Sequence, residues 1–281
     1  MIDLVQTILM AILQGIIEWL PISSEGQLTL IFINIYNIPE LEAVTLALFL
    51  HLGTMFAVLW KFREDFYRII DINAFLTHIL ILVTFGTMIT AIPIVFFLKN
   101  IWEDLSYYFP IPTDILFTFL IGLLLIGTGF ILSKKPEQGI RGFSSLTYKE
   151  AIVLGMIQGV AALPGISRSG MTLTFLLVIG LTQQDALRMS FIISVPAVLG
   201  ATTLEYILKG LYFSSSDVVI GTIIFPYIFV IIAILISALI GLATMNTLLS
   251  LKNIPYNKFC IGFGFITIFI AILTFLVNNL A

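Results

Sequence analysis

The sequence predicts an all-α polytopic membrane protein with six transmembrane helices, two re-entrant helix–loop–helix pairs and an inverted-topology repeat. Of its 281 residues, 59% are hydrophobic and only 10% are charged, with a mean hydropathy of +1.12. A soluble domain carries about 25% charged residues. Many apolar runs approach the ~20 residues that a helix needs to cross hydrocarbon. We expect one integral membrane domain over residues 1–281.

Six stretches are apolar over the full length of a bilayer crossing. They are residues 43–60, 76–98, 113–132, 189–208, 220–240 and 260–278.

Two further apolar regions are interrupted. Residues 4–20 end at Pro21 and a polar run, and residues 150–163 end at Pro164 and a second polar run. Each arm is short for a crossing, and proline ends a helix. Both regions are therefore predicted to be re-entrant hairpins, whose irregular backbone needs protein or a water-filled cavity around it. The alternative makes 4–20 a true span and moves the N-terminus to the other side.

Basic residues favour one orientation. If the first hairpin enters from outside, ten lysines and arginines fall in the loops 61–75, 133–149, 182–188 and 246–259, which then face the cytoplasm. Only Lys99 and Lys209 fall in outer loops, as the positive-inside rule expects. The second hairpin then enters from the cytoplasm. We expect a multi-pass protein of the plasma membrane, with its cavity facing the outer side.

An internal repeat aligns the two interrupted regions. With residue n set against n+144, Gln14-Gly15 matches Gln158-Gly159, Ile22-Ser23 matches Ile166-Ser167, and Gly26 matches Gly170. A repeat at half the chain length predicts two halves, 1–140 and 141–281. Paired interrupted helices in inverted repeats place a site near the midplane. The alternative is that glycine and serine recur wherever hairpins turn.

Charged side chains at this depth mark the candidate site. An ionised group within the bilayer costs at least ~2.5 kcal/mol, so Glu18 and Arg168 are expected to share one cavity. Gln14 lies on the same helical face as Glu18. An ion pair that only locks the two repeats together is the structural alternative.

The run Gly165-Ile-Ser-Arg-Ser-Gly170 offers hydroxyls and a guanidinium where a helix begins. Backbone N–H groups and the helix dipole favour an anion there, and arginine adds bidentate recognition of phosphate. Capping by Ser169 alone is the simpler alternative. In the first loop, Ser24 and Gln27 also fit a capping box, so capping and catalysis both stay open for them.

A carboxylate, hydroxyls and an anion cradle inside a bilayer indicate a phosphorylated lipid as ligand. Glu18 could hold a divalent cation or act as general base, and Ser24 could be a nucleophile. His51 is either packed or a proton carrier. No basic stripe indicates nucleic acid, and the single Cys260 allows no intramolecular disulfide.

The runs QGIIEWLPISSEGQ and LPGISRSGMT resemble the signatures of the undecaprenyl-diphosphate phosphatase, or bacitracin-resistance, family. The resemblance continues through SLTYKEAIVLGMIQG and SFIISVPAVLGAT. It implies an inverted-repeat membrane phosphatase that removes the terminal phosphate of a polyprenyl diphosphate to recycle the lipid carrier. It also implies a divalent cation, Mg²⁺ or Ca²⁺, and brings Thr172 into the site.

Together these arguments predict a set of site residues. Glu18, Ser24 and Arg168 are expected to be catalytic, with Glu18 also the metal ligand, and His51 or Glu25 to transfer protons. The expected substrate-binding residues are Gln14, Ser23, Gln27, Gly165, Ser167, Ser169, Gly170 and Thr172.

The chain departs from the family pattern at one point. After Ser-Ser the bacterial pattern usually continues Thr-Gly-His, whereas this chain has Glu25-Gly26-Gln27, and glutamine cannot shuttle a proton. Either the histidine is dispensable, or Glu25 or His51 replaces it, or the protein is a transporter or flippase that moves polyprenyl phosphates without hydrolysis. The sequence around Glu18 and Glu25 resembles that of archaeal relatives, for which the lipid carrier would be of the dolichyl type. The expected partners are a polyprenyl diphosphate and membrane lipids, and a homodimer is left open.

Overall fold

The computed structural model describes residues 3–108, 112–133, 139–163, 165–209, 212–213, 217–220, 223–250 and 256–280. Pro164 and the basic residues Lys134, Lys135 and Lys252 lie outside this range. The expected helix end at Pro164 and the expected cytoplasmic position of these three lysines therefore lie outside the described residues.

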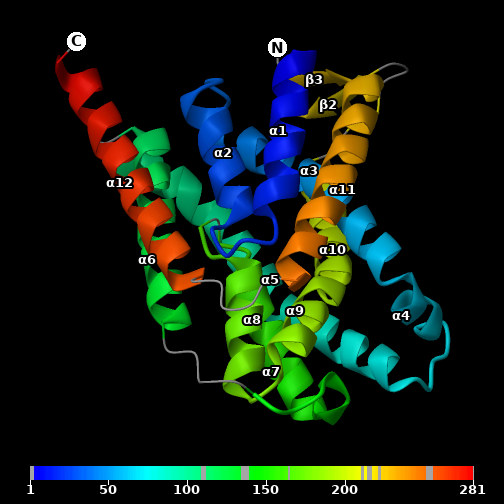
Figure 1. Ribbon diagram of the computed structural model, residues 1–281. Coiled ribbons are helices and arrows are strands. Elements are labelled where there is room, and N and C mark those ends of the chain that lie inside the picture. The colour runs from blue at the N-terminus through cyan, green and yellow to red at the C-terminus, as the bar shows by residue number, and fades with distance from the viewer. Residues whose placement is uncertain are drawn as a thin grey trace.

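Both interrupted regions form pairs of short helices. The first pair is α1 (Leu4–Ile17) and α2 (Ser24–Asn34), and the second is α7 (Tyr148–Val160) and α8 (Arg168–Val178). Capping boxes start the first helix of each pair, through the side chains of Asp3 and Thr147. Figure 1 shows that the two pairs enter from opposite ends of the molecule and that their loops meet near its middle.

Other helices surround these pairs. They are α3 (Glu40–Lys61), α5 (Phe75–Tyr108), α6 (Thr113–Leu132), α9 (Gln183–Ile192), α10 (Ser194–Lys209), α11 (Tyr227–Ser250) and α12 (Tyr256–Leu280); α4 (Arg63–Arg68) and the 3₁₀ turn η1 (Phe143–Ser145) are short.

Within the described residues, five stretches are long and apolar enough to cross a membrane. They are Glu42–Lys61, Phe75–Phe97, Gln183–Glu205, Tyr227–Ser250 and Asn257–Val277. The expected sixth span, 113–132, is helix α6, but its apolar part, Ile115–Ile131, is shorter than the other five. The polytopic helical class is thus confirmed, while the count of six is not.

The expectation of an all-α chain is wrong in one segment. Residues 212–226 contain a small antiparallel sheet of β1 (Tyr212–Phe213), β2 (Asp217–Ile220) and β3 (Ile223–Pro226), in the order β1-β2-β3. Valine and isoleucine dominate β2 and β3, and these β-branched residues favour strands. A short apolar run does not by itself distinguish a strand from a helix. The predicted span 220–240 therefore begins later, at Tyr227.

The predicted span 189–208 is also corrected. Helix begins at Gln183, where the Thr182 side chain accepts a hydrogen bond from the Asp185 N–H, so the expected loop 182–188 is largely helical. Pro196 has no N–H to donate to the Ile192 carbonyl. This missing bond accounts for the break between α9 and α10.

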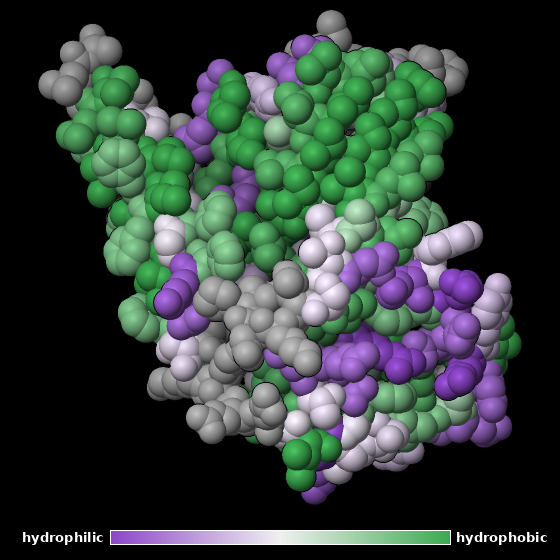
Figure 2. Space-filling view, in the orientation of Figure 1, coloured by the Kyte–Doolittle hydropathy of each residue, from purple (hydrophilic) through white to green (hydrophobic). Residues whose placement is uncertain are grey.

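Close helix packing and an apolar exterior complete the fold. A Cβ atom on Gly155 of α7 would lie 2.1 Å from the Val83 carbonyl oxygen, and one on Gly86 of α5 would lie 2.3 Å from the Ile152 carbonyl oxygen, so glycine permits this crossing. Figure 2 shows apolar side chains over α1 and α11 and hydrophilic ones lower down, toward α4. Exposed residues of α11 such as Ile231 and Leu235 are those that lipid would cover.

Candidate active site

The loop between α1 and α2 presents Glu18 and Ser24 side by side. Helix α1 ends at Ile17 with Glu18 as its C-cap, and Ser23, the N-cap of α2, has a left-handed backbone with φ +57°. Such a conformation costs a residue other than glycine about 1–3 kcal/mol. The Trp19 Nε1–H donates to the Gly241 carbonyl oxygen of α11 at 2.8 Å and anchors the loop.

Serine hydroxyls join this loop to the one between α7 and α8. Ser23 Oγ accepts the N–H of Gly26 at 3.3 Å and that of Gly165 at 3.2 Å. In the second loop, Ser167 Oγ accepts the N–H of Gly170 at 3.1 Å, the same cap 144 residues later. The bond from Gly165 therefore joins the two loops, while the other two bonds cap α2 and α8.

The Glu18 carboxylate is the centre of the polar cluster. Its side chain is only 3% exposed, and Oε1 lies 2.5 Å from the Arg168 guanidinium. Oε2 accepts hydrogen bonds from Gln14 Nε2 at 2.9 Å and Ser24 Oγ at 2.6 Å, and lies 3.0 Å from His51 Nε2. A buried charge needs partners of this kind. Glu18 and Arg168 share a cavity and also form an ion pair.

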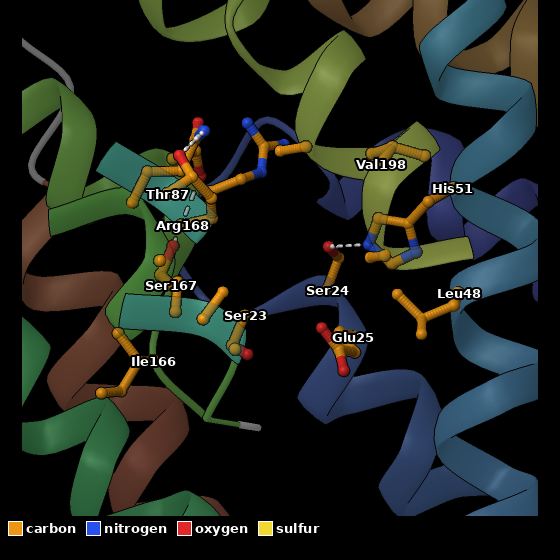
Figure 3. A pocket seen from close by; sticks show the side chains of 18 of the residues that line it. Ser23, Ser24, Glu25, Leu48, His51, Thr87, Ile166, Ser167, Arg168 and Val198 are labelled. Carbon is orange, nitrogen blue, oxygen red and sulfur yellow. Dashed lines mark hydrogen bonds between the residues drawn. The ribbon is translucent and has the colours of Figure 1, made fainter. Parts of the chain in front are cut away.

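His51 reaches the cluster from α3. Its Nδ1 lies 2.7 Å from the Ala47 carbonyl oxygen, which can only accept, so Nδ1 carries a proton. Its Nε2 is therefore the atom whose proton can come and go. This Nε2 lies 3.2 Å from Ser24 Oγ, as the dashed line in Figure 3 marks. Imidazole, hydroxyl and carboxylate are thus in mutual hydrogen-bonding range.

Arg168 is supported from behind. Its NH1 group donates weakly to the Ser190 carbonyl oxygen at 3.4 Å, and Thr172 Oγ1 donates to the Arg168 carbonyl oxygen at 2.9 Å. The hydroxyls of Thr172 and Ser190 are 2.7 Å apart. These contacts fix the start of α8 and leave the outer face of the guanidinium toward the cavity (Figure 3).

A cavity of about 730 Å³, including its open mouth, borders this cluster. Its polar wall consists of Glu18, Ser23, Ser24, Glu25, His51, Thr87, Gln158, Ser167, Arg168 and Ser169. Its apolar wall consists of Leu48, Ala91, Gly159, Ala161, Ala162, Ile166, Ala197, Val198 and Ala201.

Eight of the predicted site residues line this cavity: Glu18, Ser23, Ser24, Glu25, His51, Ser167, Arg168 and Ser169. Five others do not. Gln14 binds Glu18 from behind, Gly165 and Gly170 donate to serines, and Thr172 supports Arg168. Gln27 donates to the Ile22 carbonyl oxygen at 3.3 Å and stays out of the cavity. The structure thus divides the predicted set into a lining group and a supporting group.

Two polar lining residues were not predicted. Gln158 Nε2 donates to Thr87 Oγ1 at 3.0 Å, and both side chains face the cavity. Gln158 Oε1 is buried and has no hydrogen-bond partner within the described residues. The repeat offered a signal for Gln158, because it matches Gln14 at the same offset. No sequence signal distinguished Thr87 from the other threonines of its helix.

The donor set limits how a divalent cation fits here. Both oxygen atoms of Glu18 are engaged by protein donors, and the Arg168 guanidinium lies against one of them. Within the described residues, no group of three or more His, Cys, Asp or Glu side chains could hold a metal ion. Glu25 lines the cavity, and no described residue donates a hydrogen bond to its carboxylate. An ion shared between phosphate groups and Glu25 fits this arrangement, and a cage made by protein alone does not.

The fold and the cavity define a polytopic helical membrane protein with a buried carboxylate, hydroxyl, imidazole and guanidinium at the junction of two helical hairpins. The model of the bacitracin resistance protein BacA family matches residues 7–273. The chain belongs to this family, as the two motifs indicated.

Relatives named undecaprenyl-diphosphatase match along most of the chain. The protein of Methanothrix thermoacetophila is 37% identical over 267 residues, covering 95% of this chain and 96% of the relative. That of Methanopyrus kandleri is 34% identical over 276 residues, covering 96% of each. That of Sulfurisphaera tokodaii is 31% identical and covers 98% of this chain and all of the relative. The expected similarity to archaeal members is confirmed.

Proposed function

We propose that the protein hydrolyses a polyprenyl diphosphate such as undecaprenyl diphosphate to the monophosphate and inorganic phosphate, which returns the lipid carrier to use. One observation carries the proposal: Ser24 Oγ lies 2.6 Å from Glu18 Oε2 and 3.2 Å from His51 Nε2 at the wall of a cavity that Arg168 also lines. A hydroxyl to act as nucleophile, a base, and a guanidinium to bind the phosphate thus lie at one cavity. The names of the relatives support the same reaction.

In the proposed reaction, Ser24 Oγ attacks the terminal phosphorus. The new Oγ–P bond forms as the bond from phosphorus to the bridging oxygen breaks, and that electron pair leaves with the polyprenyl monophosphate. His51 Nε2 takes up the serine proton, and Glu18, which lies against both groups, stabilises the imidazolium that forms. Water then attacks the phosphoserine, releases phosphate and restores the hydroxyl. General acid–base assistance of this kind contributes roughly 10²–10⁴-fold.

Arg168 has two tasks in this scheme. Its NH2 group holds Glu18 in place and its NH1 group contacts Ser190, while the side chain lines the cavity, where the N–H groups not used in these contacts can bind the phosphate that is transferred. A guanidinium carries five N–H donors, so one group can serve both partners. Stabilising the charge of the transferred phosphate is the larger part of catalysis in phosphoryl transfer.

Glu25 is the residue we assign to the divalent cation. Mg²⁺ is commonly bound through one or two carboxylates together with substrate phosphates. Bound there, it would neutralise phosphate charge. This assignment moves the metal from Glu18, whose oxygens already have partners, to the neighbouring carboxylate.

The topology proposed for the chain has six spans, two re-entrant pairs and two inverted halves, 1–140 and 141–281. The matched serine caps at Ser23 and Ser167 and the opposed entry of the two hairpins in Figure 1 support it. The basic loops then face the cytoplasm, and the cavity opens to the outer side of the plasma membrane.

A second candidate function is movement of a polyprenyl phosphate without hydrolysis, which the glutamine at position 27 and the opposed hairpins favour. Purified protein supplied with farnesyl or undecaprenyl diphosphate and Mg²⁺ distinguishes the two. We expect phosphate release that a Ser24→Ala variant abolishes. Absence of release from every prenyl diphosphate would favour transport.

A further inference from the structure

The cavity has an apolar wall that takes no part in the proposed phosphate chemistry. Ala91 of α5 and Ala197 and Ala201 of α10 form part of it, and the serines and Arg168 line the same cavity. Thr87 and Ala91 are four residues apart, as are Ala197 and Ala201, so each pair lies on one helical face. We call these four residues the α5–α10 wall.

We propose that the isoprenoid chain passes between α5 and α10 at this wall, so that the first isoprene units lie against Ala91, Ala197 and Ala201 while the diphosphate lies against the serines and Arg168. The proposal rests on the proposed function, because it assigns the other end of the same substrate.

The two flanks of α10 differ. Toward α3 the helix is sealed: Val198 is buried, and Thr45 Oγ1 of α3 donates to Glu205 Oε2 at 3.0 Å, one turn beyond Ala201. Toward α5 the helix packs only lightly. The side of α10 next to the wall is open, since a Cβ atom on Gly200 would meet nothing within 4 Å, whereas Leu199, 47% exposed, lies on the opposite face of the helix.

Helix α5 shows the same arrangement. Thr87 and Ala91 face the cavity, while their neighbours Met88 and Ile89 are 51% and 43% exposed on the surface that lipid covers. On each helix, residues that line the cavity are therefore followed within one or two positions by residues that lipid would cover. Small side chains leave room at this boundary for a methyl-branched chain.

A second lightly packed boundary, between α2 and α6, does not meet this description. Asn34 Nδ2 of α2 donates to Thr118 Oγ1 of α6 at 3.3 Å, and Ile121 of α6 is buried against the Gly26 and Gly165 backbone. Among the side chains that the structure describes, none from α6 lines the cavity. A lipid tail at α2–α6 would have to displace these contacts.

Photocrosslinking tests the path without depending on turnover. The probe is a prenyl diphosphate with a benzophenone attached close to its first isoprene unit, added to the purified full chain in lipid nanodiscs. We expect adducts in peptides covering residues 87–97 and 197–205, and competition by unlabelled farnesyl diphosphate. Ala201→Phe should reduce these adducts at least tenfold. Leu199→Phe, which adds bulk on the exposed face of α10 opposite the wall, should leave them unchanged.

A second matched pair guards against misfolding: Ala91→Phe against Met88→Phe, with thermal unfolding measured for all four variants. Adducts confined to α2 and α6, or no adducts at all, would overturn the path. Phosphate release from farnesyl diphosphate is measured on the same preparation. Adducts on α5 and α10 without any phosphate release would refute the proposed hydrolysis and leave the path standing.

Discussion

Ser24 on α2 faces His51 on α3, with 3.2 Å between the serine Oγ and the imidazole Nε2. The bacterial pattern that the first motif resembles has a histidine at position 27, where this chain has a glutamine directed at the Ile22 carbonyl oxygen. An imidazole is therefore present beside the hydroxyl, but it comes from the neighbouring helix.

The first prediction follows from that contact. His51→Gln should lower kcat for a prenyl diphosphate by about 10²–10⁴-fold, the usual loss when a general acid–base group is removed. Gln27→Asn is the control and should stay close to the parent, because Gln27 does not line the cavity. Turnover of His51→Gln at the parental rate would reduce His51 to a packing residue.

Arg168→Lys should lose most of the activity while the protein remains folded. Lysine keeps the charge but lacks the planar array of donors that lets one group hold Glu18 and a phosphate together. Arg188 provides a matched control, since it pairs with Asp65 at 2.5 Å outside the cavity. Arg188→Lys should retain activity. Near-parental kcat/KM in Arg168→Lys would remove the bidentate contact from the mechanism.

Acid should loosen the start of α7. Hydrogen bonds from Arg141 lower the pKa of Glu150 from its ordinary 4.5 to about 2. The folded-state pKa is the lower one, so the stabilisation is present above about pH 4.5 and is lost as the pH falls toward 2. The pair is partly exposed, which limits its contribution to roughly 1 kcal/mol or less.

Hydrogen exchange of the first turn of α7 measures this effect. Protection should fall between pH 5 and pH 3 in the parent, after correction for intrinsic exchange, and should be low and nearly constant in Glu150→Gln. Equal protection in the two proteins at both pH values would show that the Arg141–Glu150 pair contributes nothing to the stability of α7.

Labelling of single cysteines tests the orientation in the membrane. In a Cys260→Ala background, a cysteine at Asn37, in the exposed turn after α2, should react with a membrane-impermeant reagent on intact cells. Cysteines at Asp71 and Lys149, also exposed, should react only after the cells are broken. The opposite pattern would place the cavity mouth on the cytoplasmic side.

Much of the arrangement could be predicted because charge inside a bilayer is so costly. Glu18 and Arg168 are 150 residues apart, yet the cost of leaving either one unpaired in hydrocarbon already indicated a shared cavity. The interrupted helices could be predicted for a similar reason, since proline and a polar run cannot continue a lipid-exposed helix.

Other features depended on details that a pattern does not contain. Which hydroxyls face the cavity follows from the rotation of α8, so Ser169 lines it while Thr172, three residues later, turns to Ser190. The strands at 212–226 were missed because an apolar run of valine and isoleucine looks the same in a sheet and in a membrane helix. Thr87 could be identified only from the structure, where its hydroxyl accepts a hydrogen bond from Gln158.

The hydrogen-bonding partners of Glu18 are synthesised at different times. Gln14, Ser24 and His51 all precede residue 52, whereas Arg168 is added 117 residues after His51. At 5–20 residues per second, that interval is roughly 6–23 s of synthesis. The nascent chain thus supplies an amide, a hydroxyl and an imidazole to its buried acid well before the guanidinium emerges from the ribosome. The nascent N-terminal half can therefore supply hydrogen-bond partners to its own buried carboxylate. The reactive centre is complete only once the second hairpin has been synthesised.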